Sequence, residues 1–264
     1  MTKNISETLP REMQQHTYSI MYEVEGKHWW FAGRRRILAS FLEEICRSLE
    51  ADSRQTTRPH ILDVGCGTGA NLEMLAQYGE TEGVDISPEA LAFCRARGLE
   101  KVKQGEAERL PYEDKRFDLV TALDVVEHLD DDVAGLEEIR RVLRPGGYAL
   151  LFVPAFMFLW GVQDDVSHHR RRYTLAGLRR AVNDAGLEVE RATYANISFF
   201  APILLGRVLM RLTGVRPASE NSINVSALNG LFGRVLGAER HLLRRISFPF
   251  GVSAICVARR NDKT

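Results

Sequence analysis

The chain has 264 residues, of which 45% are hydrophobic and 27% charged, and its formal net charge is zero. Such a length and composition predict one globular domain with a large core, carrying an insertion or a small second lobe. A neutral chain exerts no general attraction on nucleic acid, so we expect no nucleic-acid partner. The four cysteines are scattered without a CxxC pair, which argues against a zinc or disulfide framework and favours a reducing cytoplasm. The N-terminus lacks the pattern of a signal peptide. The sequence contains no run of eighteen apolar residues free of charges, so we expect no membrane-spanning helix.

Residues 1–59 precede the first predicted strand. Apolar residues recur with helical spacing over residues 34–49, which predicts an amphipathic helix. An aromatic and basic segment, residues 28–36, stands at its start. One interpretation is aromatic packing beside a solvated basic face, and the other is a helical lid over a ligand pocket. We predict the lid.

A strand, a tight glycine turn and a helix are predicted over residues 61–75. The turn, residues 65–69, has three glycines in five positions, so its backbone can approach a ligand closely. It ends at a helix N-terminus, where free N–H groups attract polar or anionic ligand atoms. Asp85 closes the next predicted strand, at a distance from the turn where an acid accepts hydrogen bonds from a ribose. These features indicate a nucleoside-cofactor site.

The glycine turn alone permits more than one nucleoside cofactor. Its pattern Gly65-x-Gly67-x-x-Ala70 satisfies the dinucleotide fingerprint, so an NAD-dependent oxidoreductase is an alternative. No Gly-Lys-Ser/Thr follows, which excludes a phosphate-binding P-loop. Asp63 stands on the strand just before the glycines, where its carboxylate would repel a pyrophosphate and attract a cationic amino group.

Strand and helix patterns alternate over residues 61–154, which predicts a parallel α/β sheet. The fourth predicted strand, residues 117–123, leads into a polar segment that contains Glu127 and His128. Polar groups just beyond a parallel strand lie where open α/β sheets bind ligands. Glu127 and His128 could also hold a divalent ion, but no full ligand set is visible in the sequence. We therefore predict no metal site.

Several motifs of this region resemble those of the class I S-adenosylmethionine-dependent methyltransferases. The resemblance rests on Leu62–Gly69, on the acidic segment Gly105–Tyr112, and on the turn Pro145–Gly147 before the strand Tyr148–Pro154. It implies S-adenosyl-L-methionine as the cofactor. It also implies a doubly wound, mostly parallel, seven-stranded sheet of the Rossmann-like methyltransferase fold. It does not indicate the methyl acceptor.

The resemblance also implies which residues contact the cofactor. Asp85 would bind the ribose, while Glu106, where aspartate is commoner in the family, and the backbone of Ala107 would bind the adenine amino group. Arg35 would meet the methionine carboxylate, with Trp30 in the aromatic lid. The predicted cofactor-binding residues are Asp63, Gly65, Cys66, Gly67, Gly69, Asp85, Ile86, Glu106, Ala107, Leu123, Trp30 and Arg35.

Titratable side chains follow the fifth predicted strand, within residues 164–173. In similar methyltransferases this region binds the acceptor, and an oxygen acceptor benefits from a general base. Histidine is suited to that task because it titrates near neutrality. The predicted catalytic residues are His169, His128, His168 and Tyr173, with His169 favoured as the base. One alternative is a structural role for His128. The arginines 170–172 could bind an anionic group of the acceptor or form a plain surface run.

Residues 195–251 separate the last two predicted strands and are too many for a structureless hairpin loop. They include a very apolar run, residues 197–212, and a second amphipathic segment, residues 228–246. Seven arginines against two glutamates give them a balance of 7 − 2 = +5 within a neutral chain. The insertion is predicted to be a helical cap. Peripheral membrane contact through residues 197–212 is one hypothesis, and helices packed on the core with arginines in water is the other.

Three parts are thus predicted: an N-terminal helical lid (1–59), a Rossmann-like domain (60–194 plus 252–264) and a helical cap (195–251). The predicted function is methyl transfer, to oxygen, on a small-molecule or a lipid- or glycan-linked acceptor. A non-catalytic subunit that binds S-adenosylmethionine for a partner is a further alternative. The sequence does not assign an oligomeric state.

Overall fold

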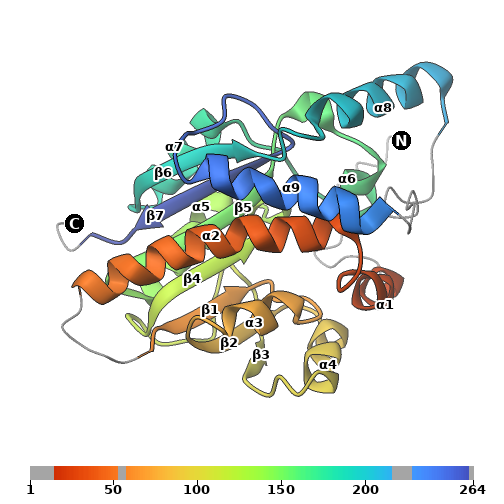
Figure 1. The fold of residues 1–264 in the computed structure, drawn as a ribbon. Coiled ribbons are helices and arrows are strands. Elements are labelled where there is room, and N and C mark those ends of the chain that lie inside the picture. The colour runs from red at the N-terminus through yellow and green to blue at the C-terminus, as the bar shows by residue number, and fades with distance from the viewer. Residues whose placement is uncertain (1–14, 53–57, 216–227, 262–264) are drawn as a thin grey trace, which may run out of the picture.

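The structure, a computed structural model, describes residues 15–52, 58–215 and 228–261 (Figure 1). Its strands are β1 (His60–Val64), β2 (Glu80–Asp85), β3 (Val102–Gln104), β4 (Phe117–Leu123), β5 (Leu143–Pro154), β6 (Glu188–Ala195) and β7 (Ser253–Arg259). Its helices are α1 (Gln15–Val24), α2 (Trp29–Asp52), α3 (Ala70–Leu75), α4 (Pro88–Ala96), α5 (Asp132–Val142), α6 (Val162–Val166), α7 (Leu175–Asp184), α8 (Phe200–Thr213) and α9 (Asn229–Leu243). Two short 3₁₀ helices, η1 (Val126–His128) and η2 (Met157–Leu159), follow β4 and β5.

All these strands form one sheet in the order β3-β2-β1-β4-β5-β7-β6. The first five strands pair in parallel, and β7 runs antiparallel between β5 and β6. The predicted fold, a mostly parallel seven-stranded Rossmann-like sheet, is therefore confirmed. Strands added after β1 lie on one side of it up to β3, and from β4 onward they lie on the other side. This change of direction between β1 and β4 leaves a crevice at their carboxyl ends, which is the usual ligand position in such sheets.

β5 begins earlier than predicted, at Leu143 rather than at Tyr148. Its pairing with β4 jumps from Leu143 to Tyr148 while β4 advances only from Phe117 to Leu119. The predicted turn, residues 145–147, is thus a bulged part of the strand. Gly146 takes a φ of +79° there, a left-handed conformation that favours glycine.

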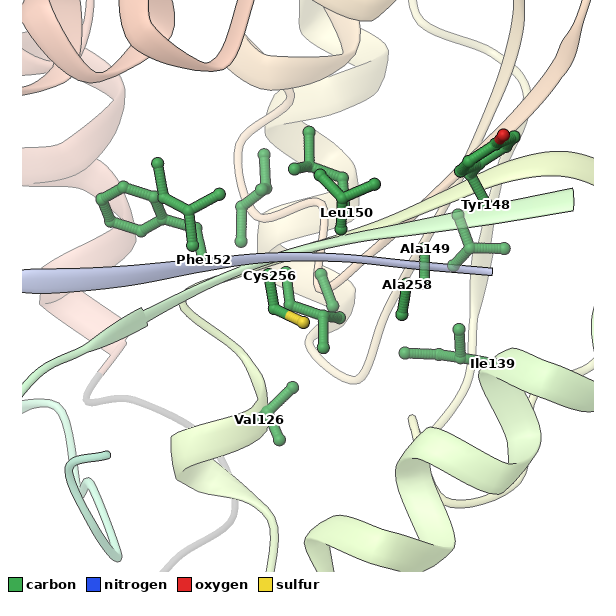
Figure 2. Packing of buried hydrophobic residues seen from close by; sticks show 14 of the residues in the cluster. Val126, Ile139, Tyr148, Ala149, Leu150, Phe152, Cys256 and Ala258 are labelled. Atoms are coloured by element: carbon green, nitrogen blue, oxygen red, sulfur yellow. The ribbon is translucent and has the colours of Figure 1, made fainter. Parts of the chain in front are cut away.

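The hydrophobic core lies on both faces of the central strands (Figure 2). Alternate residues of β5 point to opposite sides, so Leu150 and Phe152 face α2 while Ile139 of α5 packs on the other face (Figure 2). The apolar stripe of α2 belongs to this same core through Ile37, Leu38, Phe41, Leu42 and Ile45. Most of the predicted lid is therefore a core helix, and only α1 and the segment up to Arg35 lie over the candidate site. The boundaries of the three predicted parts stay a prediction.

The insertion between β6 and β7 contributes α8 and α9, both helical as predicted, with residues 216–227 outside the described residues. α9 lies beside α2 in front of the sheet (Figure 1). None of the described helices combines the length and the apolarity needed to cross a membrane.

Glycines bring α2 and α9 into close contact. A Cβ atom at Gly33 would lie 2.7 Å from the side chain of Leu236, and one at Gly237 would lie 2.7 Å from Cδ of Arg36. Glu239, buried on α9, accepts hydrogen bonds from the backbone N–H groups of Asn196 (2.7 Å) and Ser198 (2.8 Å). The insertion is thereby fixed both to α2 and to the end of β6.

We expect the substitution Gly33→Val to lower the free energy of unfolding by about 1–3 kcal/mol, because the added side chain overpacks the α2–α9 contact. Gly230→Val, at a position of α9 where a Cβ meets no described heavy atom within 4 Å, is the matched control and should change stability by less than about 0.5 kcal/mol. Urea unfolding followed by circular dichroism measures both. Equal stability of the two variants would contradict the close contact.

Candidate active site

A cavity of about 830 Å³ opens at the carboxyl ends of the parallel strands. Its walls come from the segments that follow β1 to β5, from α1 and the start of α2, and from α8. The cavity therefore occupies the crevice that the strand order predicts, and the insertion forms part of it.

The glycine turn forms one wall in the conformation that its sequence predicts. Gly65 has a φ of +65°, and a Cβ there would lie 2.4 Å from Cγ2 of Val125. Gly67 has a φ of +53° and faces open space, because no described heavy atom lies within 4 Å of a Cβ built there. Its N–H donates to Oδ2 of Asp85 (2.8 Å), whose Oδ1 accepts from the N–H of Ser87 (2.9 Å). The turn is thereby joined to the end of β2.

This wall fits the nucleoside part of S-adenosylmethionine. A carboxylate has about four acceptor sites, so Asp85 can bind ribose hydroxyls in addition to these two N–H groups. Ten of the twelve predicted cofactor-binding residues line the cavity: Gly65, Cys66, Gly67, Asp85, Ile86, Glu106, Ala107, Leu123, Trp30 and Arg35.

The other two predicted cofactor-binding residues, Asp63 and Gly69, lie off the cavity wall. Asp63 is buried within the sheet, where its Oδ1 accepts a hydrogen bond from the hydroxyl of Thr121 (2.6 Å). Burial raises the pKa of Asp63 to about 7, against the opposing effects of Thr121 and Arg34. Gly69 precedes α3 with a φ of +92°, and a Cβ there would meet the side chain of Leu99 at 2.7 Å. Asp63 and Gly69 thus pack behind the residues that line the cavity, and the geometry does not support their direct contact with the cofactor.

The basic segment at the start of α2 places two arginines on the cavity wall. Arg35, the residue selected from the sequence, donates to the backbone carbonyl of Glu25 (2.6 Å). Arg34, which the sequence reasoning missed, is buried in an ion pair with Asp124, and burial lowers the pKa of Arg34 to about 10. The helical spacing could have identified Arg34 as a buried residue. It lies four positions before Leu38, which is buried, and residues four apart share one face of a helix.

α1 is tied to the glycine turn through Glu25. This carboxylate pairs with Nη2 of Arg97 (2.5 Å) and accepts a hydrogen bond from the hydroxyl of Thr68. Because Glu25 also lines the cavity, the segment between α1 and α2 closes over the cofactor end of the site.

Two of the four predicted catalytic residues, His128 and His169, lie together on the cavity wall. Their rings are 4.6 Å apart between centroids and nearly perpendicular. Burial, with a smaller contribution from His169, lowers the pKa of His128 to about 3, so this ring is neutral. Glu127 lies behind them, fully buried, with its Oε1 3.9 Å from Nε2 of His169. Burial raises the pKa of Glu127 to about 8.

Asp164 fixes the orientation of His169. Its Oδ1 lies 2.8 Å from Nδ1 of His169 and accepts a hydrogen bond from Nε of Arg172 (2.7 Å). Its Oδ2 accepts from the N–H of Gly161 (2.7 Å) and lies 3.6 Å from Nη1 of Arg207 on α8. Burial by itself raises the pKa of Asp164, but the hydrogen bond from His169 and the charge and hydrogen bond of Arg172 outweigh it and lower the pKa to about 2. An ionised Asp164 accepts the Nδ1–H of His169 and leaves Nε2 with its lone pair.

Asp164, Arg172 and Arg207 all line the cavity. The sequence reasoning missed Asp164 and Arg207, and it considered Arg172 only as one of three arginines that could bind an anionic acceptor group. Arg172 belongs to a basic run whose members look alike in sequence. Arg207 carries a weak signal, an arginine within the very apolar run of the insertion, and it is only 5% exposed.

Tyr173, a predicted catalytic residue, does not lie on the cavity wall, so the geometry does not support a catalytic role for it. Its hydroxyl is turned away from the cavity and donates to Oδ2 of Asp132 (2.6 Å), so Tyr173 ties the segment after α6 to α5. Burial raises the pKa of Tyr173. His168 also lies off the cavity wall, on a left-handed turn with a φ of +55°. Adjacent histidines therefore take different positions, and only His169 reaches the cavity.

α8 has an inner and an outer face. Its inner face lines the cavity with Pro202, Ile203, Gly206, Arg207 and Met210. Its outer face exposes large apolar side chains: Leu205 (60%), Leu209 (50%) and Leu212 (78%). Arg211 donates to the carbonyls of Phe158 (2.9 Å) and Trp160 (2.8 Å). Both arginines of α8 thus contact the protein, and large apolar side chains dominate its outer surface.

Residues 62–151 match the family model of the methyltransferase domain. The chain is 34% identical over 125 residues to norajmaline N-methyltransferase of Rauvolfia serpentina, covering 44% of this chain and 43% of that protein. It is 35% identical over 136 residues to fatty-acid O-methyltransferase of Mycolicibacterium smegmatis (49% and 44%). It is 31% identical over 153 residues to ubiquinone biosynthesis O-methyltransferase of Thiobacillus denitrificans (50% and 66%). The matched region is thus less than two thirds of these relatives, and their acceptors differ.

Two solved structures share the fold over nearly the whole chain. One is a chain of the complex between the Haloferax volcanii Trm112 methyltransferase activator and a methyltransferase, with a TM-score of 0.58, 20% identity and 95% of each chain covered. The other is an S-adenosylmethionine-dependent methyltransferase of Thermotoga maritima, with a TM-score of 0.54, 16% identity and coverage of 94% of this chain and 100% of that one.

Asp85→Ala should weaken the binding of S-adenosylhomocysteine at least tenfold, about 1.4 kcal/mol, because the ribose loses its carboxylate partner. Isothermal titration calorimetry gives the dissociation constant. Glu100→Ala removes the same charge from an exposed position and should leave the affinity within twofold. Binding of NAD without binding of S-adenosylhomocysteine would contradict this assignment of the cavity.

Proposed function

Because the chain belongs to the class I S-adenosylmethionine-dependent methyltransferases, we propose that it transfers a methyl group from S-adenosylmethionine to a hydroxyl or carboxyl oxygen of a partly apolar acceptor. One observation carries the proposal: an oriented histidine, His169, lines the same cavity as the glycine turn and the apolar inner face of α8.

The cofactor end of the cavity accounts for donor binding. Bound S-adenosylmethionine supplies a methyl group on a positively charged sulfur, which makes that methyl susceptible to in-line attack. Asp85 and the glycine turn would hold the nucleoside part of the cofactor, and Glu106 would face its adenine. Arg35 would bind its carboxylate. Alignment of donor and acceptor can supply several kcal/mol of the barrier reduction by itself.

The acceptor end accounts for activation of the acceptor. A hydroxyl must lose its proton as its oxygen attacks, and help from a positioned group contributes roughly 10² to 10⁴-fold. The Asp164 carboxylate holds the Nδ1–H of His169, so Nε2 is the ring atom that can serve the acceptor. Arg172 and Arg207 stabilise the ionised Asp164 and add positive charge beside the cavity.

The walls of the cavity favour an acceptor with an apolar part. α8 contributes Pro202, Ile203 and Met210, and aromatic rings of Trp29, Phe199 and Phe232 pack together beside them, with Trp29 and Phe199 4.5 Å apart between centroids. Relatives named for fatty-acid and ubiquinone-pathway O-methylation support an acceptor of this class. A nitrogen acceptor is the second candidate, because one relative is named as an N-methyltransferase.

His169→Ala should lower methyl transfer at least a hundredfold while the affinity for S-adenosylhomocysteine stays within twofold. Long-chain fatty acids and alkylated phenols serve as acceptors, and release of S-adenosylhomocysteine measures turnover. His168→Ala is the matched control, since that ring lies off the cavity, and it should keep at least half of the activity. Cofactor binding without methyl transfer to any acceptor in the panel would instead support the non-catalytic subunit.

We further propose that the outer face of α8 inserts into a membrane surface from which the acceptor is taken. α8 lies at the edge of the molecule (Figure 1), and its outer face carries three leucines that are at least half exposed. An amphipathic helix binds an interface mainly through buried apolar area. This contact uses the same segment that the sequence suggested, residues 197–212. Its attraction comes mainly from the leucines, because Arg207 is buried and Arg211 is hydrogen-bonded to the backbone of Phe158 and Trp160.

Leu209→Asp combined with Leu212→Asp should abolish co-sedimentation of the protein with phospholipid vesicles, because two charges replace the apolar anchor. Leu242→Asp combined with Ile246→Asp is the control, at and just beyond the end of α9, where both side chains are also more than half exposed. The control should sediment like the unchanged protein. Absence of vesicle binding by the unchanged protein at both low and high salt would dispose of the proposal.

A further inference from the structure

Three metal-ligating side chains meet at the acceptor end of the cavity. A carboxylate oxygen of Glu127 and one ring nitrogen each of His128 and His169 lie within 4.8 Å of one another. Glu127 and His128 are neighbours in sequence, and His169 joins them from the segment after α6. We propose that these three residues bind a divalent transition-metal cation, and that this cation binds the acceptor's oxygen.

The state of Glu127 is the first argument. Its side chain is fully buried, and among the described residues neither of its oxygens has a hydrogen-bond partner outside the backbone of Glu127 itself. A buried carboxylate with so few hydrogen bonds is costly unless it is paired or binds a metal. The nearest ring nitrogen, Nε2 of His169, is 3.9 Å away, too far for a hydrogen bond. A cation between the carboxylate and the two rings would satisfy it.

The surroundings of the two histidines are the second argument. Metal-ligating histidines almost always donate their other ring N–H to a carboxylate or a backbone carbonyl. His169 directs Nδ1 at Asp164 (2.8 Å), and the ring of His128 hydrogen-bonds the backbone carbonyl of Ser167. Asp164 is held in turn by Arg172 and Gly161. Both rings are thereby oriented with one nitrogen left for a ligand.

The donor set selects the class of cation. Two imidazoles and one carboxylate suit zinc and neighbouring transition metals, whereas magnesium and calcium prefer oxygen ligands. Ligand atoms of a tetrahedral zinc site lie roughly 3.4 Å apart, given zinc–ligand distances of about 2.0–2.2 Å. The most widely separated ligand atoms, up to 4.8 Å apart, must therefore approach each other by about 1.4 Å. His128 and His169 line the cavity and Glu127 lies behind them, so further coordination positions face the cavity.

This arrangement assigns a chemical task to the cluster, and that part of the inference rests on the proposed methyl transfer. A cation lowers the pKa of an oxygen ligand bound to it. The O–H bond of a coordinated acceptor would break with both electrons staying on oxygen, and the proton would leave to water in the cavity. The oxidation state of the metal would not change. His169 would then hold the cation rather than receive the proton.

Zinc binding tests the site without any acceptor. Protein freed of metal by a chelator is titrated calorimetrically with Zn²⁺, and one ion per chain is expected, with no measurable binding of Mg²⁺ at the same concentration. Glu127→Gln and His128→Gln should each weaken Zn²⁺ binding at least a hundredfold. His168→Gln, which removes an adjacent imidazole outside the cluster, should leave it within twofold.

Circular dichroism and unchanged affinity for S-adenosylhomocysteine show which variants are folded. If either Glu127→Gln or His128→Gln fails to fold, the other variant still tests the site. No Zn²⁺ binding by the metal-free unchanged protein, or equal binding by the cluster variants and His168→Gln, overturns the site. Methyl transfer at full rate with chelator present overturns the catalytic task alone and leaves the proposed function intact. Zn²⁺ binding by a protein that transfers no methyl group supports the site and counts against the proposed function only.

Discussion

The ionised carboxylate of Asp164 holds the acceptor end of the site together. Four groups converge on it: the ring of His169, the guanidinium groups of Arg172 and Arg207, and the N–H of Gly161. Removing one partner of such a buried charged network leaves the other charges uncompensated. Because Arg207 belongs to α8, the same carboxylate links the insertion to the histidine on the cavity wall. Whatever shifts α8 therefore acts on the orientation of His169.

A chain of buried charges runs between the two ends of the cavity. Arg34 pairs with Asp124 just after β4, and its charge also acts on Asp63 within the sheet and on Glu127 behind the histidines. The pKa values of Asp63 and Glu127 are raised mainly by burial, and Arg34 opposes that effect at both residues. One residue of the basic segment thus influences the cofactor end and the acceptor end together.

Short-range features of the sequence predicted the cofactor half of the site well. The glycine turn and Asp85 are adjacent to strand ends, so their position follows from the parallel sheet alone, and ten of the twelve predicted residues lie on the cavity wall. The acceptor half depends on contacts between distant segments. Nothing local distinguishes His168 from His169, or shows that Tyr173 is turned to Asp132. Asp164 and Arg207 are 43 positions apart and meet only in the folded chain. The ligand set of the proposed metal site was invisible for the same reason, because its third member lies 41 positions beyond His128.

The close packing of α2 on α9 has a consequence for how the chain is made. The backbone N–H of Trp29 donates to the side chain of Asn229, two hundred positions later (3.4 Å). During synthesis the apolar stripe of α2 leaves the ribosome well before its glycine-lined partner, α9, has been made. Contacts of such long sequence separation form late and leave apolar surface uncovered in the meantime. α2 is therefore a natural binding segment for chaperones until α9 has emerged.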